Sequence, residues 1–184
     1  MNITYKIATG EDAELIKNLI NEMYGIEYEK REIKNIATAI ENKTEIYLLA
    51  YLDNKCVGFS GASLNNDYYA DIITPDIAVL DYIYSKTFQV SFGLISNLLN
   101  RLVDLGVKSA IIQVQTYNDQ RFFHYALSDK NIIKSSPIES KGKIYEDQIL
   151  KVEDLNKVAK MSFRELMKKA HNYSIKEEIN KKSI

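Results

Sequence analysis

The segment from Asp76 to Gly106 constrains the fold of this chain more than any other part of the sequence. Residues 77–84 are almost continuously apolar or aromatic and rich in β-branched side chains, which is typical of a strand buried on both faces. From Gly93 the apolar residues recur with the period of a helix, and Gly106 follows where a helix would end. Residues 107–116 are a second strand-like run, so the three elements predict a βαβ unit with parallel strands and a right-handed crossover.

The start of the predicted helix is a candidate binding site. In a βαβ unit, the loop after the first strand brings the free N–H groups and the positive dipole end of the helix to the carboxyl edge of the sheet. The segment between Ser85 and Gly93 occupies that position here. It favours an anionic ligand, although every βαβ unit has such a helix end and most hold no phosphate.

A polar row follows the second strand, in the segment from Tyr117 to Leu127. A helix starting near Asn118, turning about 100° per residue, brings Asn118, Arg121 and Tyr125 to one side. His124 points well away from Tyr125, and we expect it to be exposed or to serve as a reserve proton donor.

In this order, the motifs resemble those of the GCN5-related N-acetyltransferase (GNAT) family over roughly residues 3–150. Family members carry an R/Q-x-x-G-x-G/A loop that opens a helix and binds pyrophosphate mostly through backbone N–H groups, and N-x-x-A-x-x-x-Y on the next helix. The loop is degenerate here, because Val90 stands where Arg or Gln is usual and Ile95 where Gly or Ala is usual, while Gly93 matches. In the second motif, Arg121 replaces the usual Ala.

The resemblance implies an architecture. We expect an α/β (α+β) fold with a mixed, mostly antiparallel central sheet, helices on both faces and one parallel βαβ unit: strand 77–84, helix 93–105 and strand 107–116. Residues 1–150 would form a GNAT-like acyltransferase domain and residues 151–184 a C-terminal helical extension.

The resemblance also implies transfer of an acetyl group from acetyl-CoA, as co-substrate, to a primary amine of an unidentified small-molecule or peptide acceptor by direct attack on the thioester. Asp81 is expected to remove the proton of the amine, directly or through water, and Tyr125 to protonate the departing thiolate. Asn118 would hydrogen-bond the pantetheine arm, and a backbone N–H near residues 83–85 would stabilise the developing oxyanion. The expected acetyl-CoA site comprises Ile83, Tyr84, Ser85, Val90, Ser91, Phe92, Gly93, Leu94, Asn118 and Arg121.

These roles have plainer alternatives. Asp81 can be a carboxylate paired with a backbone or tyrosine donor, and Tyr125 can be one of thirteen tyrosines packed on a helix face. The whole chain can be a non-catalytic descendant of the same fold that binds acyl-CoA or a protein partner, an alternative motivated by Val90, Ile95 and Arg121.

Composition limits the classes of partner and of site that we expect for this chain. The net charge of −1 and the absence of a long apolar run predict no binding to nucleic acid and no membrane span, and the first residues contain no secretory signal, so we expect a cytoplasmic location. The single cysteine, Cys56, cannot form an internal disulfide and is expected to be a small packed side chain. His124 and His171 are the two histidines and lie far apart in the sequence, so we predict no metal site.

Periodicity and turn residues assign the rest of residues 1–150. Asp53-Asn54 predicts a two-residue hairpin turn, and Thr9 with Asp12 predicts a capping box. The pattern leaves residues 65–75 unplaced, and two acidic, tyrosine-rich segments, 24–28 and 68–71, lie where the family holds the acceptor amine. The predicted strands are 3–8, 45–52, 55–64, 131–135 and 143–151, the last two antiparallel, and the predicted helices are 10–24 and 29–42, with a break at Gly25.

Beyond residue 150 the character of the chain changes, with nine Lys and Arg against five Asp and Glu. Ser162 with Glu165 and Ser174 with Glu177 both have capping-box spacing, which predicts two short helices split near Asn172. Such a segment is most often a solvated tail packed on its own domain. A homodimer contact is the alternative, through an apolar face formed by Phe163, Leu166, Met167 and Ala170.

Overall fold

A computed structural model describes residues 2–24, 32–64, 76–116 and 120–183. Within these residues seven strands form one sheet in the order β1-β2-β3-β4-β5-β7-β6. Strands β4 and β5 are parallel and every other neighbouring pair is antiparallel, which confirms the predicted mixed sheet with one parallel βαβ unit. The strands are β1 (Ile3–Ile7), β2 (Glu45–Leu52), β3 (Lys55–Ser63), β4 (Ile77–Ser85), β5 (Ser109–Gln115), β6 (Ile132–Ser140) and β7 (Lys143–Val152).

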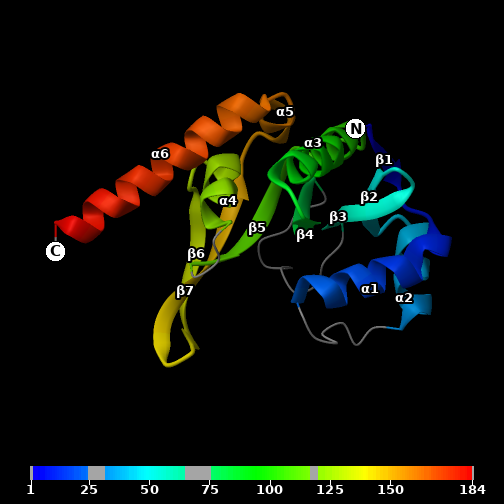
Figure 1. Cartoon of the computed structure of the whole chain (residues 1–184), viewed down its shortest axis with the longest axis horizontal. Coiled ribbons are helices and arrows are strands. Elements are labelled where there is room, and N and C mark those ends of the chain that lie inside the picture. Colours follow the sequence, from blue (N-terminus) through cyan, green and yellow to red (C-terminus); the bar gives the residue numbers. More distant parts are fainter. Residues whose placement is uncertain (1, 25–31, 65–75, 117–119, 184) are drawn as a thin grey trace.

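Helices cover both faces of the sheet, as predicted (Figure 1). Leu48 and Ala50 of β2 face the core under α3 to α6, whereas Tyr47 and Leu49 face the core under α1 and α2. This alternation is the period of a strand that is buried on both sides. The helices are η1 (Gly10–Asp12, a 3₁₀ turn), α1 (Ala13–Tyr24), α2 (Ile33–Glu41), α3 (Phe88–Asp104), α4 (Arg121–Ser128), α5 (Leu155–Ala159) and α6 (Phe163–Lys182).

The predicted turns form for the expected physical reasons. Asp53 and Asn54 both have positive φ, 49° and 65°, as a two-residue type I′ turn between β2 and β3 requires. Gly106 has φ +84° just after α3, in the left-handed conformation that commonly ends a helix.

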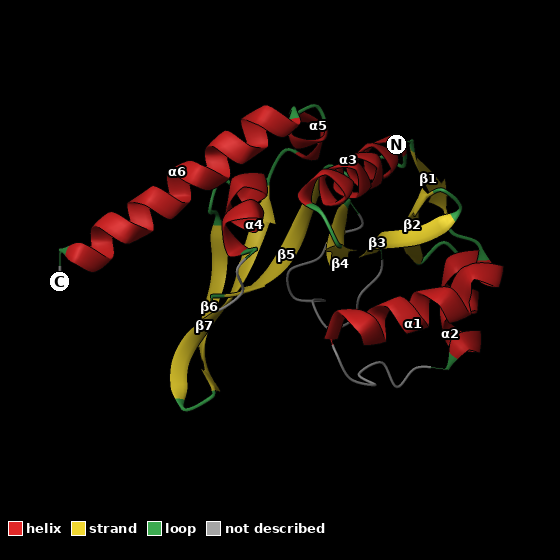
Figure 2. Ribbon diagram, viewed as in Figure 1, coloured by secondary structure: helices red, strands yellow, loops and turns green. Residues whose placement is uncertain are grey.

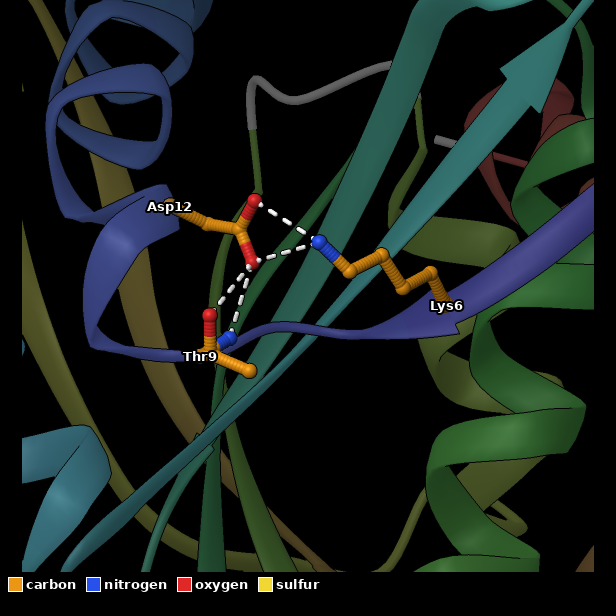
Figure 3. A network of polar contacts seen from close by, with 3 residues as sticks. All are labelled: Lys6, Thr9 and Asp12. Carbon is orange, nitrogen blue, oxygen red and sulfur yellow. Dashed lines mark hydrogen bonds and ion pairs between the residues drawn. The ribbon is translucent and has the colours of Figure 1, made fainter.

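The predicted capping box at the start of the first helical segment is present (Figure 3). The Asp12 carboxylate accepts from the Thr9 amide at 2.8 Å and from the Lys6 ammonium at 3.0 Å. Burial alone raises the pKa of Asp12, but these two donors outweigh it, so the pKa lies below its ordinary value. The cap joins the end of β1 to the turn that leads into α1.

The expected pair of short C-terminal helices is wrong, because α6 runs unbroken from Phe163 to Lys182; Ser162 caps it, but the backbone at Ser174 stays helical. Buried Leu166 and Ala170 hold α6 against the domain, and this packing outweighs the local capping signal near Asn172. The start of the helix predicted at residues 29–42, the break at Gly25 and the segment 65–75 lie outside the described residues.

Candidate functional site

Strands β4 and β5 part halfway along their length (Figure 2). Their parallel pairing runs from Ile77 with Ser109 to Leu80 with Ile112 and ends there. On the other side, β4 stays paired with β3 as far as Ser85 with Gly58. The edge of β4 from Asp81 to Ser85 that faces β5 therefore lies beyond the shared ladder, at the carboxyl end of both strands.

Asp81 marks the point where the strands part. The β3–β4 register steps from Ala62 with Leu80 to Gly61 with Tyr82, so Asp81 is the extra residue of a β-bulge. The Ser63 hydroxyl donates to the Asp81 carboxylate. Ala62 belongs to the core under α3, so its neighbour Ser63, and Asp81 with it, lie on the α1/α2 face of the sheet.

Close packing of aromatic rings surrounds the next residue of β4 on that face. The rings of Tyr47 and Tyr82 stack with centroids 6.1 Å apart, and Phe59 lies 5.7 Å from Tyr82. Gly61 between them allows this, because a Cβ there would come within 2.7 Å of the Tyr47 ring and 3.1 Å of the Tyr82 ring.

The helix after β4 begins earlier than the sequence predicted. It starts at Phe88 rather than Gly93, because Thr87 caps it: the Thr87 side chain accepts from the Val90 amide at 3.4 Å. Val90 is buried and extends the apolar stripe of Leu94 by one turn. The Ser85 hydroxyl donates to the Thr87 carbonyl at 2.6 Å and lies 2.8 Å from the Ser91 hydroxyl, which fixes the junction between strand and helix.

Because α3 starts at Phe88, different backbone amides lie in its first turn than the sequence predicted. The amides of Phe88 and Gln89 lie in the first turn, where a helix has no internal acceptor for its N–H groups. The Ser91 amide donates to the Thr87 carbonyl at 3.1 Å, and later amides lie within the helical ladder. Sequence reasoning missed Thr87 and the two residues after it, although Thr is a recognised residue for the N-cap.

The residues expected at the phosphate loop lie at the start of α3. The side chains of Val90, Ser91, Leu94 and Ile95 are buried, so Ile95 fills core and not the open edge of β4. Gly93 has a packing role that the sequence did not show, because a Cβ at this position would overlap the Tyr5 hydroxyl of β1. Phe92 is half-buried and packs on Phe163, with ring centroids 5.3 Å apart.

Tyr125 lies on the other face of the sheet from Asp81. It is 2% exposed, and its hydroxyl donates to Gln148 Oε1 of β7 at 2.9 Å, while Gln148 Nε2 donates to Glu146 at 2.7 Å. Burial, and next the charge of Glu177, raise the pKa of the Tyr125 phenol. Gln148 is therefore a partner of the candidate tyrosine that the spacing of the motif did not reveal.

Arg121 points toward the C-terminal helix. Its guanidinium binds Glu177 of α6 at 2.8 Å and lies 4.2 Å from the centre of the Phe122 ring. Asn118, the third member of the predicted polar row, lies outside the described residues.

The expectation that His124 is exposed is wrong. The side chain is 8% exposed, and its Nδ1 has no hydrogen-bond partner among the described residues. Burial lowers the pKa of His124 to about 4, because the charged imidazolium is disfavoured away from water. The helical wheel gave no information about which sides of α4 are covered, and every residue from Phe123 to Ser128 is buried.

Other kinds of site find no support in the described part of the chain. Residues 2–24, 32–64, 76–116 and 120–183 contain no group of three or more His, Cys, Asp or Glu that could hold a metal ion. Among the helices of these same residues, none has both the length and the apolar character to cross a membrane.

Comparison with solved structures supports the fold described above. No protein-family model and no curated protein sequence matches the chain. Among solved structures, a GNAT-family acetyltransferase from Streptococcus pneumoniae superposes with a TM-score of 0.63 at 16% identity, covering 82% of this chain and 98% of that one. The chain has the GNAT fold.

Two further GNAT-fold neighbours were solved with a ligand. The protein yncA from Salmonella typhimurium, in complex with acetyl-CoA, has a TM-score of 0.61 at 11% identity and covers 83% of this chain and 94% of that one. The Arabidopsis thaliana protein NAA60, also with acetyl-CoA, has a TM-score of 0.59 at 11% identity and covers 82% of this chain and 97% of that one. The neighbours match almost in full, while about a sixth of this chain lies outside each match.

Proposed function

We propose that this protein is an acetyl-CoA-dependent N-acetyltransferase that transfers the acetyl group to a primary amine by direct attack on the thioester. The observation that carries the proposal is the parting of β4 and β5 after Leu80 and Ile112, next to the start of α3. A strand edge that lies beyond its ladder with the neighbouring strand can pair with the amides of a pantetheine arm, as an added strand would. The acetyl-CoA found in yncA and NAA60 supports this choice of co-substrate.

The phosphates of the co-substrate would lie at the start of α3. The first-turn amides of Phe88 and Gln89, and the positive end of the helix dipole, favour an anion there. The predicted residues from Val90 to Leu94 form the next turns behind these amides. On β4, a backbone N–H between Ile83 and Ser85 would face the thioester oxygen. Asn118 would lie along the pantetheine arm, and Arg121 remains part of the proposed acetyl-CoA site.

The chemistry follows from what the amine and the thiolate need. A lysine-like amine with a pKa of about 10.4 has roughly one molecule in a thousand unprotonated at pH 7, so a base that removes the proton raises the concentration of nucleophile. We assign this role to Asp81, which lies at the bulge on the α1/α2 face, and the role of proton donor to Tyr125, on the opposite face. The amine would then arrive on one side of the sheet while the thiolate receives its proton from the other.

The alternative is a GNAT-fold module that binds acyl-CoA without turning it over. Two observations favour it: the Tyr125 hydroxyl already donates to Gln148, and the Asp81 carboxylate already accepts from Ser63. Each of the two proposed catalytic groups is thus engaged by a neighbouring side chain.

Two measurements separate the candidates. Calorimetric titration with acetyl-CoA reports binding, and a free-thiol assay over a panel of primary amines reports turnover. Binding together with amine-dependent release of CoA supports the acetyltransferase. Binding without thiol release on any amine supports the non-catalytic module, and absence of binding rejects both.

A further inference from the structure

Helix α6 lies along α4 with a cavity on each of two sides. Met167, Ala170, His171 and Ser174 follow one another at helical spacing and line a cavity of about 220 Å³. Tyr173, Lys176, Glu177 and Asn180 line a second cavity of about 200 Å³ on another face of α6. Spacings of three and four residues place each set on one stripe of the helix.

The first residues of α3 and α4 form the remaining walls of the first cavity. Phe88, the first residue of α3, and Phe122 and Phe123, in the first turn of α4, form its other walls. The start of α3 and the middle of α6 thus share a cavity, although they are far apart in the sequence. We call it the three-helix cavity.

The walls of the two cavities differ in chemistry. The three-helix cavity has mostly aromatic and aliphatic walls, and the described residues that line it include no Lys, Arg, Asp or Glu. The second cavity is lined by Lys130, Lys176 and Glu177 together with aromatic rings. A neutral planar ring suits the first cavity, because aromatic side chains stack on the π-face of any base. An apolar wall has neither a positive charge nor a hydrogen-bond donor with which to bind a phosphate.

We propose that the three-helix cavity binds the adenine base of acyl-CoA, so that α6 forms one wall of the nucleotide site. This proposal rests on the proposed function, which places the phosphates of the co-substrate at the amides of Phe88 and Gln89. The Phe88 side chain, 55% exposed, belongs to the same residue as the first of those amides and opens onto the cavity. A base linked to the phosphates through one ribose is thereby close to the Phe88 ring, with Gln120 and Ser174 supplying polar atoms for its ring nitrogens.

The helix that makes this wall belongs to the C-terminal segment, held against α4 by the ion pair of Arg121 with Glu177 at 2.8 Å. Because α6 forms one wall of the proposed adenine site, its packing against α4 should increase the affinity of the protein for the nucleotide.

The test compares two ligands that differ only in the nucleotide. Calorimetry with CoA and with phosphopantetheine, which lacks the whole 3′-phospho-AMP part, is carried out on the full chain and on Phe88→Ala. Loss of one base–aromatic stack should weaken CoA binding roughly tenfold and leave phosphopantetheine binding unchanged. Leu105→Ala is the matched control, since Leu105 is also a large exposed apolar residue and lies at the other end of α3.

A second variant keeps the test decisive. Ser174→Trp fills the cavity from α6 and should weaken CoA binding at least as much as Phe88→Ala does, while leaving phosphopantetheine binding unchanged. Equal weakening of both ligands in Phe88→Ala, or unchanged CoA affinity in both variants, overturns the adenine assignment and leaves the proposed function standing. If the unmodified chain binds neither ligand, the proposed function fails and this inference fails with it.

Discussion

At the residue scale, the buried imidazole of His124 has the clearest physical consequence. Its pKa is lowered to about 4 by burial, whereas an unfolded chain protonates histidine near its ordinary value, about 6.5. The unfolded state therefore binds the proton first as the pH falls. Stability is fully present above pH 6.5 and is lost as the pH falls toward 4, by about 3 kcal/mol for this group.

We expect His124→Leu to flatten that part of the stability profile. Urea unfolding measured at several pH values between 7 and 4 should show a smaller decrease in the free energy of unfolding for the variant than for the unmodified chain. His171→Gln, at an exposed position on α6, is the control and should keep the full decrease. Identical profiles for His124→Leu and the unmodified chain would show that the imidazole is accessible to protons in the folded state.

Tyr125 tests the proposed chemistry at the same scale. Tyr125→Phe removes the proposed proton donor and the bond to Gln148, so we expect the rate constant of acetyl transfer to fall about a hundredfold while CoA affinity stays nearly unchanged. Loss of the hydrogen bond alone should cost about 1 kcal/mol of stability, measured by urea unfolding. Tyr173→Phe alters a neighbouring phenol, 5.9 Å away between ring centroids, and should leave the rate unchanged. An unaltered rate in Tyr125→Phe would remove this residue from the mechanism.

At the scale of elements, the sequence predicted those parts whose signal is local. The stripe of α3, the β4–α3–β5 unit and the turn at Asp53-Asn54 follow from periodicity and backbone preference, and all three are present. The errors arose where tertiary packing decides. The continuity of α6 depends on its packing through Leu166 and Ala170, and the burial of His124 depends on contacts that cover α4 on more than one side. The early start of α3 is the exception, because its N-cap Thr87 is a local signal.

The candidate site also has a part that could be predicted from the sequence and a part that could not. The candidate residues on β4 were predicted from the resemblance to the GNAT family, and the structure places them beyond the point where β4 and β5 part. The bulge at Asp81, the bond from Tyr125 to Gln148 and the contact of Gly93 with Tyr5 each join residues distant in the sequence. A single sequence carries no pattern from which such pairs can be derived.

The ion pair of Arg121 with Glu177 should contribute measurably to the packing of α6 on α4. The Arg121 side chain is 15% exposed and that of Glu177 is 30% exposed, so solvent screens this pair less than a surface pair. A double-mutant cycle with Arg121→Met and Glu177→Gln should give a coupling energy of about 1 kcal/mol in urea unfolding at pH 7. The more exposed pair of Lys169 with Asp129 joins the same two helices and should give a smaller value. Equal coupling in the two cycles would mean that burial does not strengthen the Arg121 pair.

At the scale of the whole molecule, the fold is one sheet with a continuous core on its α3 face. Leu155, Val158, Leu166 and Ala170 of α5 and α6 belong to the same core cluster as the buried residues of α3. The predicted division at residue 150 falls inside β7, two residues before its end. That residues 151–184 form an extension stays a prediction; in energetic terms we expect the first half of α6 to unfold together with the sheet.

Truncation tests this expectation. A chain ending at Lys160 loses the buried Leu166 and Ala170 and uncovers the apolar surface of α4, so its free energy of unfolding should fall by at least about 3 kcal/mol. A chain ending at Asn180 loses, among the described residues, only 181–183, which are exposed, so its free energy of unfolding should change by less than about 0.5 kcal/mol. Urea unfolding followed both by far-ultraviolet circular dichroism and by tyrosine fluorescence should give coincident transitions for the full chain, because α6 and the sheet share one core. Two separated transitions, or an unchanged midpoint after truncation at Lys160, would instead make α6 an independent appendage, and the link between its docking and the cavity beside α3 would be lost.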